Sequence, residues 1–120
     1  MTDTDRTLTV TPQPHRAGLV VLKVAGELDH HTAPSLRQAI DDVPYAAGVA
    51  VILDVSELLY CDSTGLTVFI NAHHRAEAAG AVLGIAGLRD DLGRVFKITG
   101  LDQFFTLHAD VEEAVASALG

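Results

Sequence analysis

The beginning of the chain alternates polar and apolar residues in a way that predicts a β-hairpin. Residues 7–12 alternate threonine with an apolar residue before a proline, a pattern typical of a short edge strand. Residues 19–25 are mostly apolar and β-branched and are followed by Gly26, so we expect a second strand there. Residues 13–17 then form the turn that joins the two strands.

Helical spacing follows, and then a second strand pattern. Leu36, Ile40 and Val43 share one face of a predicted helix, with Thr32 as its N-cap and a proline in its first turn. Residues 49–55 begin as an unbroken apolar run, as expected for a central strand that is covered on both faces. The sequence therefore predicts a helix followed by a buried strand.

The next segment predicts a parallel strand pair. A helix is expected over residues 63–79, with Gly80 as its left-handed C-terminal stop. Its inward stripe consists of Leu66, Phe69, Ile70, His73 and Ala76. Residues 81–86 form the following strand, and the order strand, helix, strand implies a right-handed parallel crossover.

Three further elements complete the prediction. A third helix ends at Gly100, and a short strand covers residues 104–107. The apolar positions that define this helix are Leu88, Leu92, Val95 and Phe96. A last helix begins at Asp110, because Glu113 three residues later resembles the second half of a capping box.

A chain of 120 residues is long enough for one compact domain and too short for two separate cores. We therefore expect a single α/β domain over residues 1–120. Its sheet is mixed, largely parallel and five-stranded, with an N-terminal β-hairpin and about four α-helices. Residues 1–6 precede the first predicted strand, and a flexible N-terminal segment is considered for them.

Charge narrows the possible partners. Sixteen acidic and eight basic residues give a net charge of −8, which repels nucleic-acid backbones and anionic membranes, so neither is an expected partner. The same charge is equally consistent with plain solubility. Because the chain has no signal-type N-terminus and no apolar run that could span a bilayer, we expect a cytoplasmic protein.

Two segments are expected to meet beyond the carboxyl ends of neighbouring strands, which is where open α/β sheets bind ligands and partners. The segments are residues 26–32, with the sequence Gly-Glu-Leu-Asp-His-His-Thr, and residues 62–66, with the sequence Asp-Ser-Thr-Gly-Leu. Each carries a carboxylate next to a helix start. This end of the sheet is therefore the candidate site.

Ser63 has three interpretations from the residues alone. Its hydroxyl, or that of Thr64, can cap the helix. Alternatively, Ser63 is presented to a kinase, with Gly65 keeping the neighbouring surface open to a partner. The third interpretation is a nucleophile in a small serine hydrolase, but no Gly-x-Ser-x-Gly elbow surrounds the residue.

The histidines and the cysteine give no sign of a metal or cofactor. The six histidines include two adjacent pairs, His30 with His31 and His73 with His74, whose side chains point about 100° apart if helical. Chelating pairs lie four residues apart on a helix. Cys61 is the only cysteine and is expected to face the core, so no catalytic residue, metal or cofactor is predicted.

Together the two segments carry a family resemblance. Residues 26–33, then an apolar strand, then residues 62–66 resemble the STAS domain of bacterial anti-sigma factor antagonists, and the likeness extends from about Leu8 to Leu119. The resemblance implies a regulator rather than an enzyme. Its unphosphorylated form would bind an anti-sigma factor and release the sigma factor held there.

The same resemblance implies residue roles. Ser63 matches the hydroxyl that the anti-sigma factor, acting as a serine kinase, phosphorylates; ATP and magnesium would belong to that kinase. A PP2C-type phosphatase would reset the cycle. The expected partner- and kinase-binding residues are Asp29, Asp62, Thr64, Gly65, Glu27 and His30.

The sequence departs from the family at two places. Tyr60-Cys61 replaces a more aliphatic pair, and Thr67 stands where a glycine is frequent. Because of these departures, the resemblance does not identify the partner. A STAS module that regulates another kinase or signalling enzyme is therefore kept as an alternative function. The oligomeric state, monomer or weak dimer, also stays open.

Overall fold

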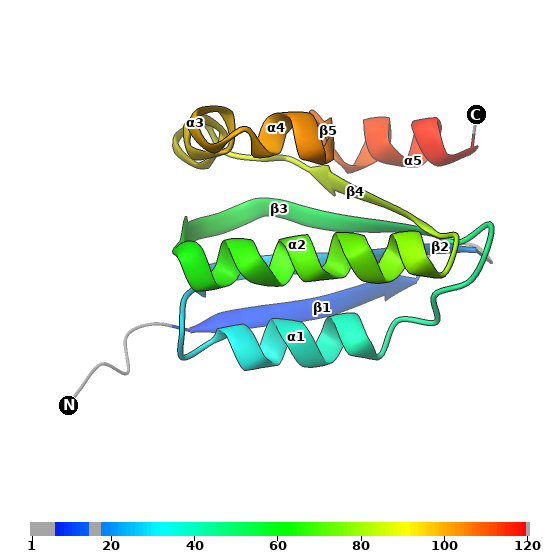
Figure 1. Cartoon of the computed structure of the whole chain (residues 1–120), viewed down its shortest axis with the longest axis horizontal. Coiled ribbons are helices and arrows are strands. Elements are labelled where there is room, and N and C mark those ends of the chain that lie inside the picture. Colours follow the sequence, from blue (N-terminus) through cyan, green and yellow to red (C-terminus); the bar gives the residue numbers. More distant parts are fainter. Residues whose placement is uncertain (1–6, 15–17, 120) are drawn as a thin grey trace.

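A five-stranded sheet forms the centre of the molecule, of which the computed structural model describes residues 7–14 and 18–119. The strands lie side by side in chain order (Figure 1). They are β1 (Leu8–Pro14), β2 (Leu19–Leu28), β3 (Ala50–Cys61), β4 (Val82–Ala86) and β5 (Thr106–His108). β1 and β2 pair antiparallel and all the other pairs are parallel, which confirms the predicted fold class.

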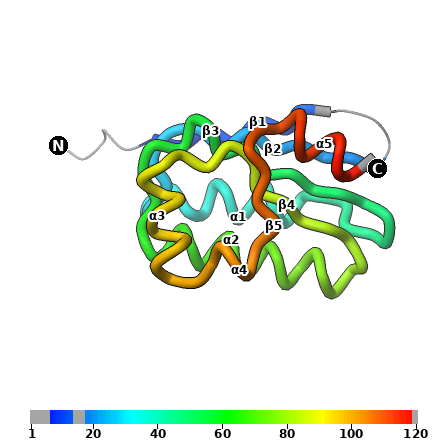
Figure 2. Tube along the Cα trace, turned by 90° about the horizontal axis from the view of Figure 1, so that it is seen from above, coloured from blue at the N-terminus to red at the C-terminus, as the bar shows by residue number. Residues whose placement is uncertain are grey.

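Helices cover both faces of this sheet (Figure 2). They are α1 (Ala33–Asp41), α2 (Ser63–Ala78), α3 (Asp90–Thr99), α4 (Leu101–Phe104) and α5 (Val111–Leu119). The larger core lies between the sheet and α1, α2 and α3, whereas Ala114 of α5 packs on the opposite face. The single-turn helix α4 was not predicted, because four residues are too few to show a helical period.

Two predictions concern residues at the start of the chain. The proposed flexible end, residues 1–6, lies outside the described residues. Of the predicted turn over residues 13–17, Gln13 and Pro14 belong instead to β1, opposite Val21 and Val20, and residues 15–17 also lie outside the described part.

The helix ends follow local chemistry at three of four predicted positions. Gly80 has a φ value of 75°, which confirms the predicted left-handed stop, and Gly100, where the third helix was predicted to end, has a φ value of 81°. At α5, the N–H of Glu113 donates to Asp110 Oδ1 at 2.8 Å, so the predicted cap is present. Thr32 stands at the N-cap position of α1, as predicted, but its side chain bonds Asp29 and Glu27 and makes no cap hydrogen bond to the helix.

The inward face of α2 is rotated from the predicted stripe. Phe69 and Ala76 are buried as predicted, but Leu66, Ile70 and His73 are only half-buried. The buried residues are Gly65, Val68, Phe69, Ala72 and Ala76. Three of these five residues, Gly65, Ala72 and Ala76, are small, whereas Phe69 fills the core with a large side chain.

β2 and β3 extend beyond the predicted ends. β3 continues to Cys61 rather than ending at residue 55, and β2 continues to Leu28. The pairing of β3 with β2 shifts register twice, once after Asp54 and once after Leu58. Each shift interrupts the alternation of polar and apolar residues, which is why the pattern predicted an earlier end.

Candidate functional site

The two segments predicted to converge do meet at one end of the sheet (Figure 1). Leu28, the last residue of β2, is the register partner of Cys61, the last residue of β3. The N–H of Asp62 donates to the carbonyl of Leu28 at 3.1 Å. Asp29 and Asp62 therefore follow directly on two paired strand ends.

Asp29 organises the turn between β2 and α1. Its side chain is buried, with 6% exposure, and Oδ1 accepts from the N–H groups of His31 and Thr32 at 2.9 and 3.0 Å. Thr32 Oγ1 donates to the carbonyl of Glu27 at 2.8 Å and accepts from the N–H of Asp29 at 2.9 Å. Thr32 thus ties the end of β2 to the turn, a role that its predicted helix cap did not anticipate.

Asp62, rather than a hydroxyl residue, caps α2. Its backbone is extended, and Oδ1 accepts from the N–H of Gly65 at 3.0 Å. The proposed N-cap roles of Ser63 and Thr64 are therefore wrong: both residues lie inside the first helical turn. A carboxylate is the better cap here because it also interacts favourably with the positive end of the helix dipole.

Ser63 is the first residue of α2 and is exposed. Within the described residues its hydroxyl makes no hydrogen bond, while its carbonyl accepts from Thr67 Oγ1 at 3.0 Å. The N–H groups of Ser63 and Thr64 likewise donate to no described residue. Ser63 therefore presents a hydroxyl and helix amides that bind no side chain or carbonyl among residues 7–14 and 18–119. Thr64 is half-buried.

Gly65 has a different role from the predicted one. It is buried, and a Cβ atom there would lie 2.6 Å from Leu28 Cγ and 2.7 Å from Cys61 Sγ. The absence of a side chain lets the start of α2 pack on the ends of β2 and β3. Gly65 therefore faces the core and does not open the surface to a partner.

Cys61 lies beneath the helix start. It packs partly buried against the main core, as predicted. Burial, assisted by the negative charge of Asp62, raises the pKa of the Cys61 thiol to about 12. The thiol is therefore neutral at physiological pH and a poor nucleophile.

The two remaining predicted residues flank the site differently. Glu27 is tied to the start of β1, because its N–H donates to the carbonyl of Thr7 at 2.8 Å and its Oε1 accepts from the N–H of Thr7 at 3.2 Å. His30 is exposed in the turn after β2 and makes an edge contact with the ring of His31, with centroids 5.7 Å apart. His30 is accessible to a partner, whereas the Glu27 carboxylate is already engaged.

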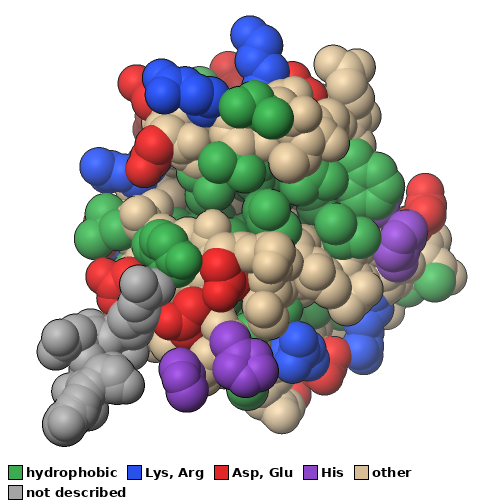
Figure 3. All heavy atoms as spheres, turned by 60° about the vertical axis from the view of Figure 1, so that its left-hand side comes forward, with side chains coloured by type: hydrophobic (Ala, Val, Ile, Leu, Met, Phe, Trp, Pro, Cys, Tyr) green, Lys and Arg blue, Asp and Glu red, His purple; other side chains and the backbone are tan. Residues whose placement is uncertain are grey.

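The surface around the site combines apolar and charged side chains. Figure 3 shows this end of the molecule, with hydrophobic side chains across its middle, histidine side chains below them, and charged side chains of both signs above and below. Leu59 and Tyr60, at the end of β3, are exposed although they are large and apolar or aromatic. Exposed apolar groups rimmed by charges are typical of protein-binding surfaces.

Residues 7–14 and 18–119 contain neither a metal-ligand cluster nor a membrane-spanning helix. In this part of the chain, no three His, Cys, Asp or Glu side chains are grouped to hold a metal ion. No helix there has the length and apolar character needed to cross a bilayer. His73, from the second histidine pair, packs against Phe104 with ring centroids 4.4 Å apart.

Comparison with known proteins agrees with this fold. The family model described as the STAS domain matches residues 10–114. An anti-sigma-B factor antagonist from Listeria monocytogenes is 38% identical over 84 residues, which cover 70% of this chain and 74% of that protein. A solved anti-sigma factor antagonist from Mycobacterium paratuberculosis is similar with a TM-score of 0.81 at 26% identity, covering 100% of both chains. The phosphorylated form of the Bacillus cell fate determinant SpoIIAA is similar with a TM-score of 0.67 at 25% identity, over 91% of this chain and 98% of that one. This chain therefore belongs to the STAS-domain family of anti-sigma factor antagonists.

Proposed function

We propose that this protein is a cytoplasmic anti-sigma factor antagonist that phosphorylation of Ser63 switches off. The unphosphorylated form binds an anti-sigma factor that is also a serine kinase, and the sigma factor is released. ATP and magnesium belong to that kinase, and a PP2C-type phosphatase restores the binding form. The protein itself carries out no reaction in this cycle.

One observation supports the switch above all. Ser63 is exposed at the first position of α2, with a hydroxyl that no described residue binds and with Asp62 holding the helix start in place. A kinase can therefore reach the hydroxyl without unfolding the helix. The unpaired N–H groups of Ser63 and Thr64 can also bind phosphate oxygens once they are attached.

The charge change is large enough to control binding and small enough to leave the fold intact. A phosphate on Ser63 adds about −1.5 to −2 charges beside Asp62. Two unit charges about 5 Å apart repel by roughly 3 kcal/mol at an effective dielectric of about 20. The favourable interaction of the phosphate with the positive end of the helix dipole offsets about 0.3–1 kcal/mol of this repulsion. A partner surface covering Ser63 would have to desolvate or repel the phosphate, which weakens binding by about a hundredfold or more.

The relatives support the same assignment. The Listeria monocytogenes relative is an anti-sigma-B factor antagonist, and SpoIIAA has been solved in a phosphorylated form. Asp29, Thr64 and His30 lie at the same end of the sheet as Ser63 and are proposed partner contacts. Two alternative functions came from the sequence: a STAS module for another signalling enzyme and a small serine hydrolase. The experiments below distinguish both of them from this proposal.

Incubation with a candidate anti-sigma factor kinase and Mg-ATP, followed by phosphosite mapping, tests the proposal. We expect one phosphate on Ser63. The Ser63→Ala variant should take up none and still bind the anti-sigma factor with wild-type affinity. Ser63→Asp should bind at least about tenfold more weakly. Its effect is smaller than that of phosphorylation because an aspartate carries only part of the phosphate charge. Ser117→Ala is the matched control, since Ser117 is also an exposed helical serine but lies on α5.

Stoichiometric phosphorylation of Ser63→Ala would contradict the assignment of Ser63. A phosphorylated protein that binds the anti-sigma factor as tightly as the unmodified one would contradict the switch. A pull-down that retains a different signalling protein would favour the other STAS module. A covalent acyl group on Ser63 after incubation with an ester substrate would favour the hydrolase.

A further inference from the structure

β3 contains two extra residues between the core of the sheet and Ser63. From Lys23 to Ala25, β2 advances two positions, while its partner β3 advances three, from Asp54 to Glu57. The register shifts again where Gly26 pairs with Leu58 and the next residue of β2 pairs with Tyr60. Such shifts are β-bulges, which bend a strand and re-aim the side chains that follow.

The first bulge decides which side chains face the core. Unbroken alternation from Leu53 would put Leu58 on the face opposite the main core. Instead Leu58 is buried in that core with 1% exposure, and Leu59 is exposed. The segment that leads to Cys61 and Ser63 therefore depends on the bulge being held.

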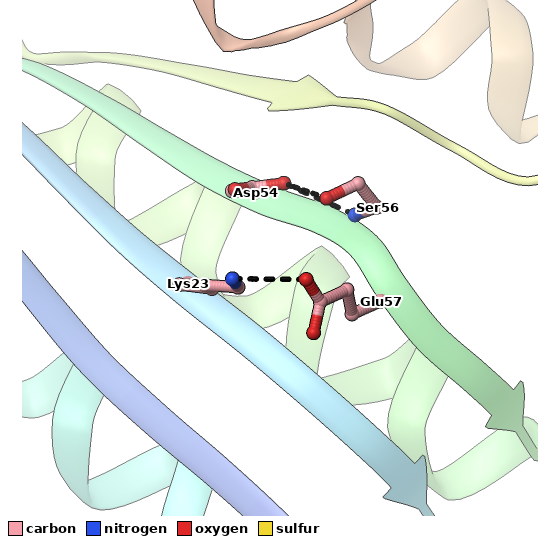
Figure 4. Close-up of polar contacts among 4 residues, drawn as sticks. All are labelled: Lys23, Asp54, Ser56 and Glu57. Atoms are coloured by element: carbon pink, nitrogen blue, oxygen red, sulfur yellow. Dashed lines mark hydrogen bonds and ion pairs between the residues drawn. The ribbon is translucent and has the colours of Figure 1, made fainter.

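Asp54 holds this bulge. Its side chain is buried, with 9% exposure, and Oδ1 accepts from the Ser56 N–H at 3.1 Å and from Ser56 Oγ at 2.7 Å (Figure 4). A bulge leaves a backbone N–H without its ladder partner. The Asp54 carboxylate supplies the missing acceptor from within the same strand.

Neighbouring elements hold the bulge from two further sides. Lys23, the cross-strand partner of Asp54, forms an ion pair with Glu57 at 3.0 Å and so connects β2 to the residue beyond the bulge (Figure 4). Gly87 lies against Ser56, since a Cβ there would be 2.8 Å from Ser56 Cβ. Because the ion pair between Lys23 and Glu57 is exposed, it contributes little to stability. The hydrogen bonds from Ser56 to Asp54 are therefore the main interactions that hold the bulge.

We propose that Asp54 is a positioning residue for the phosphoacceptor: by bonding Ser56 it sets the register in which β3 delivers Asp62 and Ser63 beside Asp29. The inference rests on the proposed function of Ser63 only where phosphorylation is the readout. Asp54 is buried and its carboxylate bonds Ser56 rather than the acceptor, so it acts through the course of the strand.

Three variants of the 120-residue chain test this role. Asp54→Ala removes both hydrogen bonds to Ser56, whereas Asp54→Asn keeps an acceptor oxygen and loses the charge. Asp110→Ala is the matched control, because it removes a carboxylate that accepts a backbone N–H at the start of α5, away from the bulge.

The first measurement needs no kinase. In the amide spectrum of the ¹⁵N-labelled protein, Asp54→Ala should shift resonances from Glu57 through Ser63 and speed exchange of the Ser56 N–H by about tenfold or more. Asp54→Asn should restore both, and Asp110→Ala should change neither. If Asp54→Ala does not fold, Ser56→Ala must produce smaller shifts over the same residues. Shifts that stop at Ser56, or equal effects of Asp54→Ala and Asp54→Asn, would overturn the proposal.

The second measurement is the rate of Ser63 phosphorylation. We expect kcat/KM to fall on the order of tenfold in Asp54→Ala and to recover with Asp54→Asn, since displacement of a reacting group by about 1 Å is costly. An equal fall in Asp110→Ala would show a general stability effect and overturn the proposal. If the wild-type chain takes up no phosphate, the function proposed for Ser63 fails, and the spectra still decide the role of Asp54.

Discussion

Replacing Gly65 by alanine tests how the start of α2 is packed. A Cβ at this position would lie 2.6 and 2.8 Å from Leu28 Cγ and Cδ2 and 2.7 Å from Cys61 Sγ. Carbon atoms in contact normally stay about 3.5–4.0 Å apart, so the helix or the strand ends must move by about 1 Å. Overpacking of this kind costs about 1–3 kcal/mol.

The helix itself gains from the substitution. Alanine is favoured over glycine by at most about 1 kcal/mol in a helix, and by less near its end. The net expectation for Gly65→Ala is therefore a loss of about 1–2 kcal/mol in the free energy of unfolding, measured by urea denaturation. Gly93→Ala in α3 is the matched control. Its Cβ would meet only Leu88 Cδ2 at 4.0 Å, so it should be stabilised by up to about 1 kcal/mol.

A double-mutant cycle makes the reasoning specific. In a Leu28→Ala background two of the three close contacts of the added Cβ are removed and only Cys61 Sγ remains, so Gly65→Ala should cost less there than in the wild-type chain. Stabilisation of Gly65→Ala equal to that of Gly93→Ala would refute the packing role. Gly65 would then be free to have the role first suggested by its sequence, that of keeping the surface open to a partner.

Three further outcomes follow from the geometry around Ser63. Asp62→Ala should lower the free energy of unfolding by about 0.5–2 kcal/mol because the Gly65 N–H loses its cap, and Asp62→Asn should retain most of it; equal urea midpoints for wild type and Asp62→Ala would contradict this. Asp29→Ala should cost about 1–3 kcal/mol in the same assay, since it leaves two backbone N–H groups in the turn before α1 without their acceptor, and Asp29→Asn should restore it. For Cys61, the folded pKa of about 12 lies above the ordinary value of 9.0, so the unfolded thiol ionises first and stability falls as pH rises above about 9, by about 1 kcal/mol at pH 10. Cys61→Ala should lack this part of the fall, and parallel pH curves for the two proteins would show that the thiol is not buried.

The arrangement of the candidate site could be predicted to a useful extent. Asp29 and Asp62 were expected together because the carboxyl ends of neighbouring parallel strands share one edge of a sheet, and the pairing of Leu28 with Cys61 confirms it. What each carboxylate binds could not be predicted. A sequence motif shows that a carboxylate and a hydroxyl are adjacent, but the backbone conformation of Asp62 decides which of them reaches the free helix amides.

Apart from the single-turn helix α4, the sequence by itself determined the order of strands and helices, because each of these elements depends on a residue pattern within its own length. It also determined the left-handed stop at Gly80 and the end of α3 at Gly100, where only local backbone sterics matter. Only the tertiary structure decided the inward role of Gly65 and the full length of β3. Gly65 has no side chain whose pattern could be read, and its environment comes from the ends of two distant strands. The bulge at Ser56 exists only relative to the register of β2, and Asp54, whose carboxylate holds it, resembles any polar residue in a strand until that partner is in place.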